Sequence, residues 1–291
     1  MRSKLVALPF AASLLIIPLI FALTESMGRD GQGENVTLAL FGATVLVEFI
    51  ALFQVIATRR LFSPSDPGHL TWSLILGFLI VRLLAEGRLA TMNFHLVEKY
   101  SEGMSGRLFF YLIVLRYLYT VSDLLFIAAL ITTIRAYKST GLTFRLLGRD
   151  YLYIAMLWTM PAITYIFRAN LIYSATGVDP YIPTYRITAV SVGAVIASLC
   201  LVVRRYVLQM GGGAVARVWS TVVAAGIARD ASFLALALLT SWWRVGAGFA
   251  EQYLLWIFSG CWLIAALYQQ EVLPEGTRDR VAHLPEPNAA G

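Results

Sequence analysis

The feature that most constrains this chain is a series of apolar blocks, each about long enough to cross a lipid bilayer. An α-helix rises about 1.5 Å per residue, so roughly 20 apolar residues cover the hydrocarbon core. Eight blocks meet this requirement, at residues 5–23, 36–57, 70–87, 108–134, 151–173, 187–203, 218–242 and 253–270. A spanning segment must satisfy its own backbone hydrogen bonds, which favours helices. The predicted fold is therefore all-α: a polytopic integral membrane bundle of eight transmembrane helices, forming a single domain over residues 1–270.

The composition agrees with this fold class. Apolar residues make up 58% of the chain and charged residues 14%, whereas an ordinary soluble domain has about 45–50% and about 25%. These values exclude a disordered chain, a disulfide scaffold and a simple water-soluble enzyme. Residues 271–291 differ from the rest, with three prolines and little hydrophobicity. They predict a short, disordered cytoplasmic tail.

The positions of the basic residues predict the orientation in the membrane. If the N-terminus is cytoplasmic, thirteen of the 23 Lys and Arg residues fall in the cytoplasmic segments and six in the outer loops. Cytoplasmic loops of membrane proteins are enriched in Lys and Arg, so both termini are expected in the cytoplasm. The same bias accounts for the net charge of +6, and we expect no nucleic-acid partner. Short loops and arginine-rich inner segments favour a bacterial-type inner membrane.

The residues needed by the common membrane cofactors are missing from the predicted spans. Retinal requires a lysine inside a helix, and haem or a metal site usually requires histidines at a common depth. The lysines and histidines all lie outside such positions, at Lys4, Lys99, Lys138, His69, His95 and His283. No GxxxxGK[ST] loop is present. We therefore expect no cofactor and no metal site.

Ionisable residues inside the spans are the only informative signal of function. There are four acids and four arginines: Glu48, Arg82, Glu86, Arg116, Asp123, Arg168, Arg229 and Asp230. A charge near the bilayer centre costs at least about 2.5–3.5 kcal/mol, so such residues face the bundle interior and pair. Arg82 and Glu86 are four residues apart and can pair on one helix face. Arg229 and Asp230 point about 100° apart on a helix, so we expect them to have different partners.

Two interpretations of these charges remain open. In the first, Arg82 and Arg168 extend to the outer headgroups and the other charges form buried pairs that only fix the packing. In the second, Arg82, Arg116 and Arg168 line a cavity open to the outer side, with carboxylates on its floor that can hold protons. The candidate ligand-binding residues of this second interpretation are Arg82, Arg116, Arg168, Asp123, Asp230, Glu48 and Tyr119. Such a cavity suits a small anionic or amphipathic ligand.

Three classes of function compete on the sequence alone. The favoured one is a carrier or transporter for a small anionic or lipid-like ligand. The second is a sensory or assembly module that acts through a partner membrane protein, although no signalling domain is attached. The third is a lipid-modifying membrane enzyme, which the absence of histidines from the spans disfavours, although carboxylates alone can perform acid–base chemistry. The lipid bilayer is the partner common to all three.

The predicted orientation can be tested with reporter fusions. Fusions after Lys138 and after Gly291 are expected to report the cytoplasm, and fusions near Lys99 and Val178 the outside, because of the distribution of basic residues. A C-terminal fusion that reports the outside would require an odd number of crossings and would contradict the eight-span topology.

Overall fold

The computed structural model describes residues 2–26, 32–99, 106–141, 143, 146–159, 162, 181–209, 213–239 and 244–273. These residues contain helices and no strands. Seven helices are α1 (Arg2–Ser26), α2 (Gln32–Arg59), α3 (Pro67–Lys99), α4 (Gly106–Ser139), α6 (Tyr181–Gln209), α7 (Gly213–Leu239) and α8 (Arg244–Val272). A further helix covers residues 148–159. Every predicted span thus overlaps a helix, and the predicted all-α fold is confirmed.

Six of these helices are long and apolar enough to cross a membrane, namely α1, α2, α3, α4, α6 and α8. Helix α7 is of comparable length and carries Arg229 and Asp230 past its middle. The predicted fifth span, residues 151–173, is described only at residues 151–159 and 162. The predicted tail lies outside the described residues from position 274 onward. The molecule is therefore a helical membrane protein.

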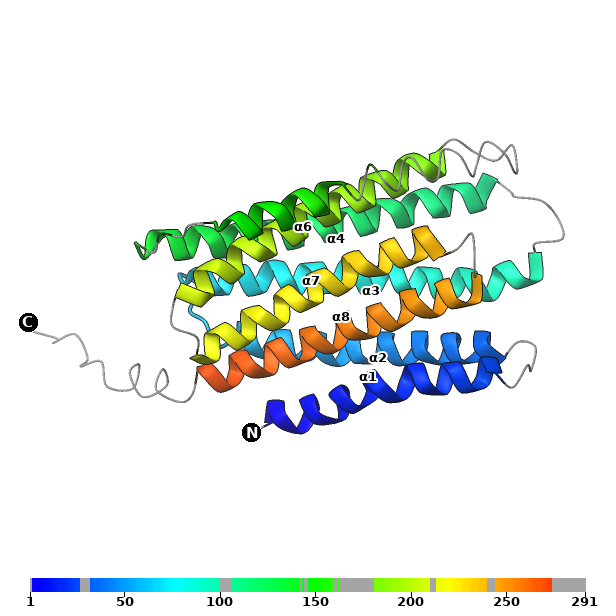
Figure 1. The fold of residues 1–291 in the computed structure, drawn as a ribbon, viewed down its shortest axis with the longest axis horizontal. Helices are drawn as coiled ribbons and strands as arrows, with labels where there is room; N and C mark the ends of the chain where they lie inside the picture. Colours follow the sequence, from blue (N-terminus) through cyan, green and yellow to red (C-terminus); the bar gives the residue numbers. More distant parts are fainter. Residues whose placement is uncertain are drawn as a thin grey trace, which may run out of the picture.

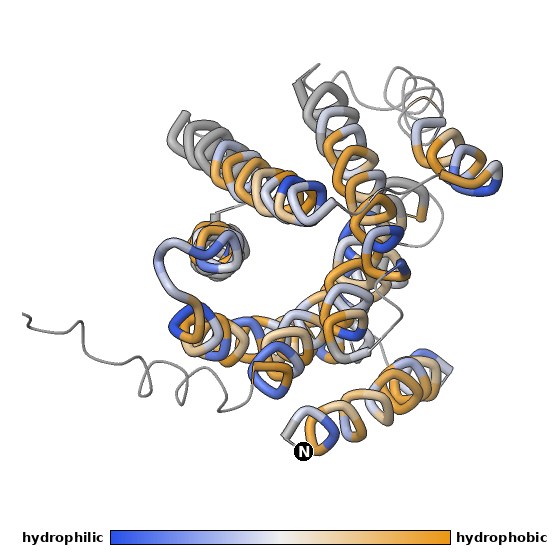
Figure 2. Tube along the Cα trace, turned by 90° about the vertical axis from the view of Figure 1, so that its left-hand side faces the viewer, coloured by the Kyte–Doolittle hydropathy of each residue, from blue (hydrophilic) through white to orange (hydrophobic). Residues whose placement is uncertain are grey.

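Six helices form a ring. Each of α2, α3, α4, α6, α7 and α8 packs against the next, and α8 packs against α2 to close the circle. Figure 2 looks along the bundle and shows the helices arranged around a common centre. Helix α1 lies outside the ring, against α2 and α8. The interior of the ring is consequently shielded from lipid by helices on all sides.

The first and last described helices meet at one end of the bundle, which we call the Ser3–Glu271 end (Figure 1). The Ser3 backbone N–H donates to Glu271 Oε1 at 2.9 Å, and the Ser3 hydroxyl donates to Glu271 Oε2 at 2.6 Å. The start of α1 and the end of α8 therefore lie on the same side of the bundle, as an even number of crossings requires. The assignment of this side to the cytoplasm stays a prediction.

A layer of four aromatic side chains fills the centre of the ring. Phe78 of α3, Phe126 of α4, and Phe258 and Trp262 of α8 are all buried, with ring centroids 5.0–6.2 Å apart. Contacts of this kind add about 0.5–1.5 kcal/mol each beyond the area they bury. Phe78 precedes the buried charges on α3 and Phe126 follows them on α4, and these two helices run in opposite directions. Phe78 and Phe126 thus lie on the Ser3–Glu271 side of the buried charges.

Helix α1 is held against α8 by a close contact at a glycine. A Cβ atom added at Gly260 would lie 2.0 Å from Phe10 Cε2, so only glycine lets the Phe10 ring sit there. Two hydrogen bonds support the contact: Trp256 Nε1 donates to Ser13 Oγ at 2.9 Å, and the Tyr253 hydroxyl donates to the Leu14 carbonyl at 2.7 Å. The docking of α1 therefore depends on a small residue at this one position.

We expect Gly260→Ala to lower the free energy of unfolding by about 1–3 kcal/mol, since overpacking forces Phe10 to move. Gly42→Ala on α2 is the matched control, because an added Cβ there meets nothing within 4 Å. Thermal unfolding in detergent measures both. Equal stability of the two variants would contradict the α1–α8 contact described here.

Candidate functional site

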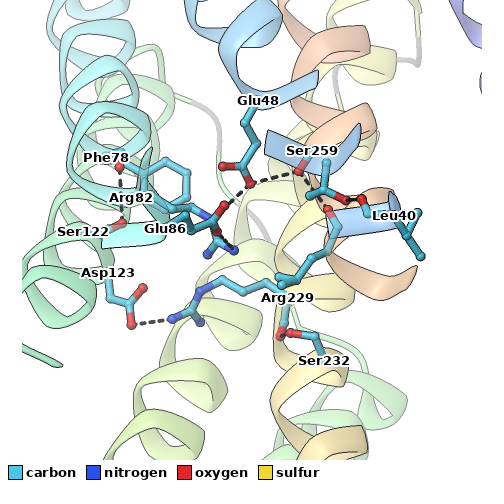
Figure 3. A network of polar contacts seen from close by, with 12 residues as sticks. Leu40, Glu48, Phe78, Arg82, Glu86, Ser122, Asp123, Arg229, Ser232 and Ser259 are labelled. Carbon is cyan, nitrogen blue, oxygen red and sulfur yellow. Dashed lines mark hydrogen bonds and ion pairs between the residues drawn. The ribbon is translucent and has the colours of Figure 1, made fainter. Parts of the chain in front are cut away.

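Charged side chains from four helices, together with a serine from a fifth, meet inside the ring and form what we call the buried charged network (Figure 3). Its members are Glu48 of α2, Arg82 and Glu86 of α3, Asp123 of α4, Arg229 and Asp230 of α7, and Ser259 of α8. All but Asp230 are buried, and the side chain of Asp230 is 12% exposed. Because the ring excludes lipid, these charges are placed where they can pair.

Arg82 is the centre of one half of the network. Its Nε lies 3.2 Å from Glu48 Oε1 and its Nη2 lies 2.8 Å from Glu86 Oε1. The guanidinium carbon lies 4.3 Å from the centroid of the Phe258 ring, a cation–π contact with the aromatic layer. The predicted pair of Arg82 and Glu86 is confirmed. Arg82 is only 2% exposed, so it stays in the interior and does not extend to the headgroups.

Glu48 has one satisfied and one unsatisfied carboxyl oxygen. Its Oε1 accepts hydrogen bonds from Arg82 Nε and from the Ser259 hydroxyl, the latter at 2.9 Å. Its Oε2 is buried and has no hydrogen-bond partner among the described residues. The carboxyl group of Glu86 interacts with that of Glu48, and both contact Arg82. Two carboxyl groups therefore share a single guanidinium.

Arg229 is the centre of the other half. It forms ion pairs with Asp123 of α4 through Nη2 and with Asp230 through Nη1, the latter at 3.1 Å. The expectation that Arg229 and Asp230 have different partners is wrong, because the long arginine stem brings the guanidinium back to the neighbouring carboxylate. The Asp230 carboxylate lies over Gly193 of α6, where an added Cβ would be 2.5 Å from Oδ1. Helix α6 thus makes room for the network with a glycine.

The two halves of the network interact electrostatically through Arg82. Arg82 also interacts electrostatically with Asp123, with Tyr119 of α4 and with Glu251 of α8. Sequence reasoning missed Glu251, because it began the last span at residue 253, whereas α8 already begins at Arg244. It also missed Ser259, since a single serine in an apolar span gives no signal. The spacing of eight residues between Glu251 and Ser259, about two helical turns, was the one available sign of a shared face.

The structure brings together some of the predicted ligand-binding residues and does not describe others. Glu48, Arg82, Asp123 and Asp230 all belong to the network, and Tyr119 lies one turn from Asp123 on α4. Position 116 lies in α4, but its side chain is outside the described part of the structure, as is all of residue 168. The convergence of three arginines on one cavity therefore stays a prediction.

The network suits the binding of protons or small ions. The buried carboxyl groups that surround Arg82 and Arg229 outnumber those two guanidiniums among the side chains described. Guanidinium groups bind carboxylates and phosphates with paired hydrogen bonds, so a ligand anion can take the place of a protein carboxylate. Within the described ranges, no group of three or more His, Cys, Asp or Glu side chains is placed to hold a metal ion.

A separate ion pair lies near the Ser3–Glu271 end. Arg205 of α6 pairs with Asp150, whose Oδ2 also accepts the Leu147 backbone N–H at 2.7 Å. This second contact is half of a capping box and fixes the start of the helix at 148–159. The hydrogen bond from Arg205 holds the pKa of Asp150 below its ordinary value. The pair attaches this helix to α6 and has no contact with the network.

No family model matches the chain, and neither a curated protein nor a solved structure matches it. The functional argument therefore depends on the geometry of the buried charged network.

We expect Arg229→Gln to destabilise the protein by about 3–5 kcal/mol, because it leaves buried carboxylates without their partner. The double variant Asp123→Asn/Arg229→Gln is expected to recover part of this loss, since one of the unpaired charges is then removed. Arg217→Gln is the matched control on the same helix, because Arg217 is exposed. Chemical or thermal unfolding in detergent measures all three. If Arg229→Gln lowers the free energy of unfolding no more than Arg217→Gln does, the ion pairs of Arg229 do not stabilise the protein.

Proposed function

We propose that this protein is a membrane carrier for a small anionic or lipid-like ligand, and that the buried charged network is its binding site. The observation that carries the proposal is that charged side chains from four helices meet inside a ring of helices. Intramembrane charges are costly and in membrane proteins usually mark a substrate or ion pathway. A site at the meeting point of several helices, inside the bundle, is also typical of transporters.

Arg82 and Arg229 are the ligand-binding groups in this proposal. Each contacts two carboxylates, which occupy the positions that a ligand anion would take. Exchange of a protein carboxylate for a ligand carboxylate or phosphate keeps each guanidinium paired throughout. Binding and release therefore avoid the penalty of an unpaired buried arginine.

The aromatic layer acts as the gate in the same proposal. Phe78, Phe126 and Trp262 lie on the Ser3–Glu271 side of Arg82, Asp123 and Ser259 along their helices, and Phe258 packs against Phe78 and Trp262. A ligand that leaves toward that end requires these rings to separate, which is the movement of helices that alternating access demands. The sensory and enzymatic alternatives draw no comparable support from the described residues.

Ser259 offers a direct test of water access, because cysteine is nearly the same size as serine. Cys200 and Cys261 are replaced by alanine, and Ser259→Cys is added to this background. In a carrier, the new thiol is expected to react with a membrane-impermeant thiol reagent from at least one side of sealed vesicles. Phosphate, sulfate or short-chain carboxylates are expected to slow the reaction.

The matched control keeps the native Cys261 and replaces only Cys200. Cys261 is two residues from Ser259 on the same helix and thus at nearly the same depth, but it belongs to the hydrophobic core. It is expected to remain unreactive from both sides. A thiol at position 259 that is inert in both vesicle orientations would overturn the carrier proposal.

A further inference from the structure

We infer that Glu48 and Glu86 form a proton-binding pair that shares a single proton, and that this proton couples the network to the proton gradient. The coupling to transport rests on the proposed function, whereas the proton-binding pair itself does not. The pair joins two neighbouring helices of the ring, α2 and α3.

The Glu48 carboxyl group has one oxygen atom that receives no hydrogen bond from the described residues. Glu48 is fully buried, and its Oε1 already accepts two hydrogen bonds, from Arg82 and Ser259. Its Oε2 has no hydrogen-bond partner in the described part of the chain. The carboxyl groups of Glu48 and Glu86 interact with each other and both contact Arg82. A buried acceptor without a donor costs about 1–3 kcal/mol, and more for a charged group. A proton placed between the two carboxyl groups supplies the missing donor.

The charges around Arg82 also favour a shared proton. Arg82 is the guanidinium that contacts both carboxyl groups, and it also faces Glu251. Two carboxylates that share one buried site do not both stay ionised, because their repulsion in a low-dielectric interior is too large. One shared proton leaves the pair with one negative charge, which the positive charge of Arg82 balances.

The groups that face the pair come from every helix packed around it. Helix α3 supplies Arg82 itself, α8 supplies Glu251 and Ser259, and α4 supplies Tyr119 and Asp123 through their interaction with Arg82. On α1, the ionisable residues are confined to its two ends, at Arg2, Lys4 and Glu25. The charge balance at Glu48 and Glu86 is thus set mainly by Arg82.

Proton binding at this pair has a consequence for Arg82. A carboxyl group that gains a proton loses its charge and holds the guanidinium less strongly. Arg82 is then better able to bind a ligand anion, so the proton and the anion enter the site together. When the proton returns to water, the second carboxylate regains its charge and competes with the anion for Arg82.

Infrared spectroscopy of the full chain in lipid membranes tests the pair without any knowledge of the ligand. A protonated carboxyl group has a carbonyl stretching band that an ionised one lacks. At neutral pH the wild-type protein is expected to show this band, and Glu48→Gln and Glu86→Gln are each expected to abolish it. Either substitution leaves one carboxylate alone with Arg82, which stabilises its charged form. Glu25→Gln, at the exposed end of α1, is the matched control and is expected to keep the band.

Two results would overturn the inference. One is a wild-type protein without the band at neutral pH, which means that both carboxyl groups are ionised. The other is a band that survives Glu48→Gln or Glu86→Gln, which places the proton elsewhere. If one variant fails to fold, the other decides. The result is independent of the thiol-labelling test at Ser259, so a proton-binding pair in a protein that is not a carrier is recognised as such.

Discussion

The architecture depends on the pairing of two buried arginines with carboxylates inside a membrane bundle. Arg82 and Arg229 are almost completely excluded from solvent, and an unpaired charge in that place would cost several kcal/mol. Helix α7 packs against α6 and α8, yet Arg229 extends across the ring to Asp123 on α4. This ion pair therefore connects two helices that are not neighbours, and it fixes the rotation of α4 and α7 about their own axes.

The aromatic layer and the charged network depend on each other. Phe258 contacts Arg82 with its ring face and packs against Phe78 and Trp262 on its other sides. An apolar layer next to the charges lowers the local dielectric constant, which strengthens each ion pair and raises the penalty for each unpaired group. Phe78 and Phe126 lie on the Ser3–Glu271 side of the network, so the rings that support Arg82 also cover the network on that side.

The sequence predicted the local properties of this site and missed the ones that depend on helix rotation. The spans and the pairing of Arg82 with Glu86 follow from spacing along one chain segment; the pairing is confirmed, and six of the helices are long and apolar enough to cross a membrane. The pairing of Arg229 with Asp123 depends on the order of helices in the ring, which no local pattern encodes. Glu251 was missed because a charged residue near the end of a span resembles a loop residue. Ser259 was missed because its role depends on a hydrogen bond to Glu48, which lies on another helix.

The ratio of buried carboxyl groups to buried guanidinium groups distinguishes a network that only stabilises the fold from one that binds an ion. A network that only fixes packing is most stable when every charge and every buried acceptor is matched, and apolar replacements are often neutral or better. Among the described side chains, the carboxyl groups around Arg82 exceed its single positive charge, and Glu48 Oε2 lacks a donor. These features reduce stability unless a proton or another ligand occupies the site. A purely structural role does not account for this loss of stability. A site that binds and releases an ion does account for it, because a network in which every charge and acceptor is already paired has no group free to bind an ion.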